Sequence, residues 1–113
     1  MSERRNKLRA RALGSKPQFR SETIQGYEIR QPSLRSRSET FKLATDSEGN
    51  VDSEKLMIAV LTNNVFVPDT DDLIFEVGDV EILMSQPAGG LIDELGQAAL
   101  RLFNLDIETA RKN

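Results

Sequence analysis

The chain has 113 residues, a formal net charge of −3, and no Cys, His or Trp, which indicates one small domain with an aliphatic core. Without Cys or His it cannot form disulfides or zinc–thiolate sites, and it lacks the commonest general base. We therefore expect no catalytic residue, no cofactor and no metal site. No stretch approaches the roughly 20 apolar residues that cross a bilayer, and no signal-like apolar run follows the basic N-terminus, so we expect a soluble intracellular protein.

The two parts of the chain differ strongly in charge. Residues 1–45 contain 11 Lys and Arg against 4 acids (+7), whereas residues 46–113 contain 4 against 14 (−10), which together give the net −3. Nucleic-acid contact by the first part, head-to-tail self-association and attraction between the two parts all remain open.

Residues 1–17 are polar and basic, with Leu8, Ala12 and Leu13 as the only trace of a helical stripe. We expect a flexible basic arm that is mostly disordered alone and becomes helical on a partner. Because no aromatic residue is interleaved to stack on bases, nucleic-acid binding is the less favoured role.

Residues 18–31 carry apolar side chains in short alternating runs on either side of Gln25-Gly26. This pattern predicts a β-hairpin with a turn at the glycine. A lone hairpin is barely stable in water, so it must pack on helices or pair with another chain.

A helix is predicted after Pro32, capped by Ser33 or Ser36 and running to about Ala44, with Leu34, Phe41 and, together with Ala44, Leu43 facing inward. The segment Asp46–Asn50 has turn chemistry. Its acids lack the spacing of a calcium-binding loop.

Residues 52–67 hold the run Leu56–Leu61, which is apolar on every side of a helix and predicts a central, buried helix. Asp52 or Ser53 can cap its N-terminus, and Pro68 prevents continuation beyond Val67. A buried strand is the rival interpretation, which the helix-forming Leu, Met, Ala and Lys disfavour.

After Pro68, the acids of residues 69–72 precede the run Leu73-Ile74-Phe75 and are interpreted as the cap and first turn of a helix rather than as metal ligands. Asp79 can cap again, which starts a short helix that ends near Pro87.

The final helix, from about Ala88 to Leu105, has the clearest periodicity in the chain. Its glycines, Gly89, Gly90 and Gly96, weaken it unless they permit close packing on a neighbour. The predicted fold is therefore mainly α: a single helical domain of about four helices at residues 18–106, with the hairpin at its start and a frayed tail at 107–113.

From Tyr27 onward, the order of these features resembles the tail assembly chaperones of long-tailed (siphovirus-like) bacteriophages or prophages. The pieces that carry the resemblance are Arg30-Gln31-Pro32-Ser33, a helix closing at Val67-Pro68, Phe75 and Asp79 before Leu83, and Pro87-Ala88-Gly89-Gly90-Leu91 before a final helix with Leu95. They cover about three quarters of the chain by the pattern of its elements. None of them is catalytic, and residues 1–17 lie outside the resemblance.

The resemblance implies a small, largely helical protein of the bacterial host cytoplasm that is needed for tail assembly and absent from the mature virion. Such chaperones are thought to coat the long, helical, aggregation-prone tape-measure protein and to recruit tail-tube subunits. A ribosomal frameshift often yields a longer form of these chaperones, and this chain would be the short one.

A chaperone for a long amphipathic helix needs an apolar groove. We expect its walls to be the final helix and the short helix before it, with Gly89 and Gly90 letting the backbones approach. The candidate partner-binding residues are Val80, Leu83, Met84, Leu91, Leu95 and Phe103. Met suits such a site because its flexible thioether adapts to varied partners.

Two other functions remain open beside the chaperone, which is also expected to self-associate. One is a small structural head or tail completion protein of a phage. The other is a nucleic-acid-binding protein that uses the basic arm. Ordinary core and cap residues of an unrelated helical domain would also produce the quoted features.

Overall fold

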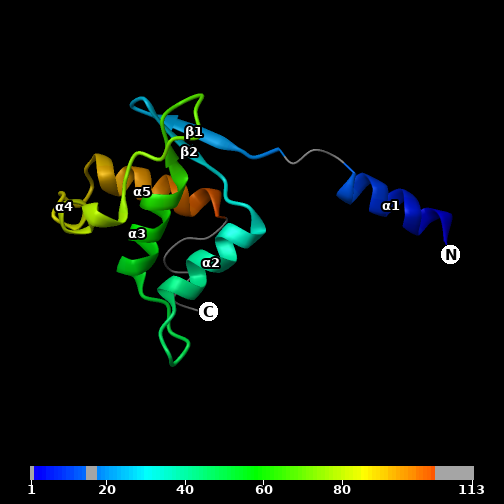
Figure 1. Ribbon diagram of the computed structural model, residues 1–113, viewed down its shortest axis with the longest axis horizontal. Helices are drawn as coiled ribbons and strands as arrows, with labels where there is room; N and C mark the ends of the chain where they lie inside the picture. Colours follow the sequence, from blue (N-terminus) through cyan, green and yellow to red (C-terminus); the bar gives the residue numbers. More distant parts are fainter. Residues whose placement is uncertain (1, 15–17, 104–113) are drawn as a thin grey trace.

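A computed structural model describes residues 2–14 and 18–103 (Figure 1). Its α-helices are α1 (Glu3–Leu13), α2 (Leu34–Ala44), α3 (Ser53–Asn64), α4 (Val80–Met84) and α5 (Leu91–Leu102), and a 3₁₀ helix η1 (Val77–Asp79) precedes α4. The strands are β1 (Ser21–Ile24), β2 (Tyr27–Arg30) and β3 (Val65–Phe66), which form one antiparallel sheet in the order β1-β2-β3.

The core lies where α3 meets α5, with α2 packed on α3 and the sheet packed on α5. Its apolar members come from every element between β2 and the end of α5 except η1. The buried ones are Ile29, Ala44, Leu56, Val60, Leu61, Val65, Leu83, Leu95, Ala98, Ala99, Leu100, Leu102 and Phe103. The predicted central helix is thus confirmed as a core element, because six of the residues of α3 are buried.

Close approach of α3 and α5 depends on Gly96. A Cβ atom placed there would lie 2.0 Å from the Sδ atom of Met57. The expectation that a glycine in the final helix permits close packing is therefore confirmed at Gly96. It is not confirmed at Gly89, where a Cβ would meet nothing within 4 Å.

The hairpin prediction is confirmed. Strands β1 and β2 pair from Ser21 opposite Arg30 to Ile24 opposite Tyr27. The two residues between them, Gln25 and Gly26, have φ of 48° and 88°. A two-residue type I′ turn requires positive φ at both of these positions.

The prediction of a mainly α fold is wrong in part, because the domain is mixed α/β. Helix α3 ends at Asn64, and the chain continues as β3 rather than as helix to Val67. Val65 pairs with Ile29, and the Asn64 side chain donates a hydrogen bond to the Arg30 carbonyl at 3.0 Å. The helix does not continue to Val67 because residue 65 pairs with β2 of the hairpin and because its β-branched Val side chain favours a strand. These two effects outweigh the helix propensity of the residues before it.

The helix predicted at Leu73–Phe75 is also wrong. Leu73 bridges to Phe66, and the Ile74 amide donates to the Val65 carbonyl at 3.1 Å, so the segment is extended beside β3. Backbone pairing with the preceding strand β3 decides this conformation, and the acids of residues 69–72 cap no helix.

Two ends differ from the predicted boundaries. Helix α5 begins at Leu91 rather than at Ala88, because Gly89 has a φ of 80° in the preceding turn and Gly90 is the N-cap. The predicted helix end at Leu105 and the frayed tail at 107–113 lie outside the described residues.

The arm of residues 1–17, expected to be helical only on a partner, contains α1, which stands away from the rest of the molecule in Figure 1.

Candidate functional site

Exposed apolar side chains gather in a hollow of about 450 Å³ between α2, α3, η1 and α4, which we call the α2–α3–α4 groove. Three of them are large: Leu43 is 70% exposed, Val77 80% and Met84 42%. The half-buried Ile58 and Val80 lie between them. The full lining is Leu43, Glu54, Lys55, Ile58, Ala59, Thr62, Asn63, Val77, Val80 and Met84.

Local structure holds this groove open. The backbone N–H of Glu76 donates to the Asp79 carboxylate at 2.8 Å, which closes a capping box around η1 and presents Val77 outward. Helix α4 is anchored by the buried Leu83. On the other wall, Asp52 caps α3 by accepting from the amides of Glu54 and Lys55 at 2.9 and 3.2 Å.

The α2–α3–α4 groove has an acidic surround. Glu54 and Lys55 line it as one acid and one base, and three further acids flank its apolar residues along the chain on the η1–α4 side: Glu76, Asp79 and Glu81. A partner with basic residues beside an apolar stripe is therefore favoured over an acidic one.

The structure divides the six predicted partner-binding residues. Val80 and Met84 line the α2–α3–α4 groove, whereas Leu83, Leu95 and Phe103 are core residues with at most 6% exposure. Leu91 is half-buried against the core.

The predicted groove between α4 and α5 is a smaller hollow of about 330 Å³, lined by residues of α3, α4 and α5. Leu83 and Met84 line it, but Val80, Leu91, Leu95 and Phe103 do not. Gly89 and Gly90 belong to the turn before α5, and the nearest neighbours of a Cβ at Gly90 would be atoms of Pro87, so neither glycine brings two helices together.

The sequence analysis missed Leu43, Ile58 and Val77 as surface residues. Leu43 was assigned to the inward face of its helix, Ile58 to the buried helix and Val77 to no role. The period of α2 alone gave no clear signal for Leu43, because Leu43 is three residues from Thr40 and next to Ala44, and both of these are buried in α2.

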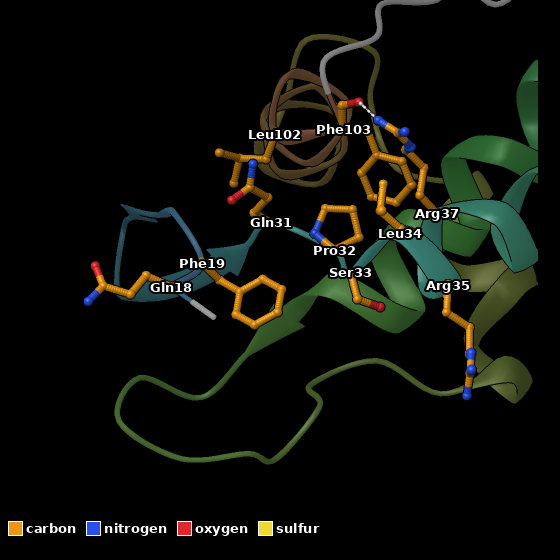
Figure 2. Close-up of a pocket in the computed structure, with 10 residues that line it drawn as sticks. All are labelled: Gln18, Phe19, Gln31, Pro32, Ser33, Leu34, Arg35, Arg37, Leu102 and Phe103. Carbon is orange, nitrogen blue, oxygen red and sulfur yellow. Dashed lines mark hydrogen bonds between the residues drawn. The ribbon is translucent and has the colours of Figure 1, made fainter. Parts of the chain in front are cut away.

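A larger hollow, of about 740 Å³, lies where the start of α2 meets the end of α5 (Figure 2). Figure 2 shows Phe19 and Pro32 facing it, while the Arg37 side chain reaches the Phe103 carbonyl oxygen at 3.5 Å. Leu34 there is 77% exposed, so the prediction that it faces inward is wrong. Its lining mixes aromatic, amide and guanidinium groups, so it is less apolar in character than the α2–α3–α4 groove.

Perturbed ionisable groups serve the fold rather than chemistry. Arg30 bonds Glu28 at 3.3 Å and Asp71 at 3.0 Å, also donates to the Thr70 carbonyl, and stacks on Phe66 with 4.1 Å to the ring centroid. The hydrogen bond from Arg30 lowers the pKa of Glu28 below its usual value, and the same bond raises the pKa of the guanidinium. This cluster fastens the loop after β3 onto β2.

Asp46 is the other shifted group. Hydrogen bonds from the backbone amides of Asn50 and Glu48 lower the pKa of its carboxyl. It therefore closes the turn between α2 and α3, as its turn chemistry predicts.

Within residues 2–14 and 18–103, no cluster of three or more acidic side chains is arranged to hold a metal ion. No helix in this described part of the chain is long and apolar enough to cross a membrane. No family model, curated protein or solved structure matches the chain. The functional argument therefore depends on the α2–α3–α4 groove and on the sequence resemblance.

Proposed function

We propose that this protein is a non-enzymatic tail assembly chaperone of a long-tailed bacteriophage or prophage. It binds helical segments of the tape-measure protein, keeps that client soluble and recruits tail-tube subunits to it. The observation that carries the proposal is the α2–α3–α4 groove, because its three large exposed side chains have no cover within the described chain. The phage context comes from the resemblance from Tyr27 onward.

The groove suits a helix better than an extended peptide. Its walls are helical, and their backbone groups are already bonded within α2, α3 and α4, so they cannot pair with a strand. An amphipathic helix presents apolar side chains every three or four residues along one face. Leu43, Ile58 and Met84 of the groove can contact these side chains. The flexible Met84 adapts to successive segments of one long client.

Met84→Glu tests this function, with Ile82→Glu as its matched control. Both residues are on α4 and both are largely exposed, but Ile82, at 66%, does not line the groove. Each variant is co-expressed with the tape-measure protein, and soluble client and its capture on the tagged chaperone are measured. We expect Ile82→Glu to behave as wild type and Met84→Glu to lose most of the client, because a carboxylate in the groove opposes apolar contact.

Circular dichroism of each isolated variant shows whether it is folded. Equal client recovery from folded Met84→Glu and from wild type would remove the α2–α3–α4 groove from the mechanism. Failure of wild type to recover any client would overturn the chaperone function itself.

A chaperone acts in the host cytoplasm and leaves before the particle is complete. Mass spectrometry of purified virions should therefore lack its peptides while infected-cell lysate contains them. Stoichiometric presence in virions would instead indicate a head or tail completion protein.

A further inference from the structure

Helix α1 is a short helix without a packing surface of its own. None of its residues from Glu3 to Leu13 is buried. Isolated helices shorter than about 12–15 residues are marginal in water. Leu8 is 48% exposed, and Ala12 lies one turn further on the same face. This helix therefore gains stability when that apolar face is covered.

The charge of α1 also calls for a partner. The helix contains five basic residues and one acid. Lys7 and Arg11 lie four residues apart, and like charges at this spacing destabilise a helix. Acids on a partner surface would relieve that repulsion.

The α2–α3–α4 groove offers the complementary surface. Its lining combines exposed apolar side chains with Glu54 and Lys55. Glu76, Asp79 and Glu81 adjoin its η1–α4 residues in the sequence, and Lys42 adjoins Leu43 on α2. Helix α1 has 11 residues, so at a rise of 1.5 Å per residue it is about 16 Å long. In Figure 1, α1 and α4 lie at opposite ends of the longest axis of the molecule, so one chain does not present α1 to its own groove.

We propose that α1 of one copy docks in the α2–α3–α4 groove of a second copy, so that the chains associate head to tail. Leu8 and Ala12 then contact Val77 and Met84 of the neighbour, and the basic side chains of α1 face the acids around the groove. Such a contact joins two different surfaces, so the chains associate by reciprocal exchange of α1 in a dimer, in a larger ring or in an open chain. The inference uses the groove on which the proposed function depends, but its test needs no client.

Cysteine cross-linking tests the contact, because the chain has no native Cys. Leu8→Cys chains are mixed with Val77→Cys chains that carry a mass tag, under mild oxidation. The control partner is Leu34→Cys, whose residue is 77% exposed, close to the 80% of Val77, but lies in the hollow of Figure 2. We expect several-fold more tagged–untagged dimer with Val77→Cys than with Leu34→Cys. High salt should reduce that excess by screening the charges.

The Leu8→Cys/Val77→Cys double variant separates contact between chains from contact within one chain. Disulfide-linked dimers or larger oligomers support the inference, whereas a cross-linked monomer would overturn it in favour of docking within one chain. Equal cross-linking to Val77→Cys and Leu34→Cys would also overturn it. In that case, salt-sensitive retention of α1 on DNA, lost when residues 1–14 are deleted, would assign the helix to nucleic acid instead.

The two proposals can fail separately. A chain lacking residues 1–14 keeps the whole groove, so under both proposals it still recovers the client. Client recovery without any cross-linking in the full chain would refute the self-docking of α1 alone. Cross-linking in the full chain, with no client recovered either by the full chain or by the chain lacking residues 1–14, would refute the chaperone function alone.

Discussion

Helices α1 and α3 are almost equal in length, at 11 and 12 residues, yet they are held in opposite ways. Each begins with a side-chain cap, Ser2 on α1 and Asp52 on α3. Six residues of α3 are buried and none of α1 is. Caps and propensity can start a helix, but burial of an apolar face supplies most of its stability. What α1 lacks in its own chain, a partner surface can supply.

The largest expected effect comes from placing a charge in α3. Leu61 is buried in the core, so Leu61→Asp leaves an unpaired charge there and should cost about 3–5 kcal/mol. That is a large part of the roughly 5–15 kcal/mol that stabilises an ordinary domain. Thermal unfolding followed by circular dichroism should show no cooperative transition at the wild-type temperature. The matched change on α1, Leu13→Asp, should leave the unfolding transition unchanged. An equal loss of stability from both changes would contradict the conclusion that burial stabilises α3 and not α1.

A smaller effect is expected from Gly96→Ala, which adds one methyl group where α5 meets α3. The new Cβ would overlap the Sδ atom of Met57, whose side chain also lines the 330 Å³ hollow and can move into it. Overpacking costs of about 1–3 kcal/mol exceed the gain of about 1 kcal/mol from replacing a helical Gly by Ala. We expect net destabilisation in urea unfolding.

Met57→Ala should remove that penalty, so Gly96→Ala made in the Met57→Ala background should stabilise the protein. A double-mutant cycle measures this coupling. Additive effects of the two changes would mean that Gly96 is not what allows the helices to approach.

Removing the two caps compares the two helices directly. Asp52→Ala deprives two backbone amides of α3 of their acceptor and should cost about 1 kcal/mol. For a domain of this size, that loss lowers Tm by about 4–8 °C. Ser2→Ala removes one bond of 3.3 Å from α1 and should not change Tm, because α1 contributes nothing to the core. A fall in Tm from Ser2→Ala would place α1 in the cooperative unit.

The smallest effect is expected from deleting residues 1–16. None of the described residues in that range is buried. The free energy of unfolding of a dilute sample should therefore change by no more than about 0.5 kcal/mol, as for most surface changes, and Tm should stay nearly the same. Differential scanning calorimetry measures it. Loss of folding would show that α1 is an integral part of the domain.

The sequence alone determined the elements whose signals are local. The apolar run Leu56–Leu61 with its Asp52 cap predicted α3, and the Gln25-Gly26 turn between alternating runs predicted the hairpin. The periodic stripe of the final helix predicted α5. Each of these signals lies within a few residues of the element that it specifies, so no knowledge of distant neighbours was needed.

Only the tertiary structure decided what Val65, Leu73 and the residues of the α2–α3–α4 groove do. Val65 and Leu73 have side chains that suit a helix or a strand, and the backbone pairing of Val65 with Ile29 and of Leu73 with Phe66 settles the choice. The face of a helix can be found from its period, but which neighbour covers that face cannot. Leu95 and Phe103 were therefore placed with Met84 in one groove, although packing of α5 against α3 and the sheet buries the first two and leaves Met84 exposed.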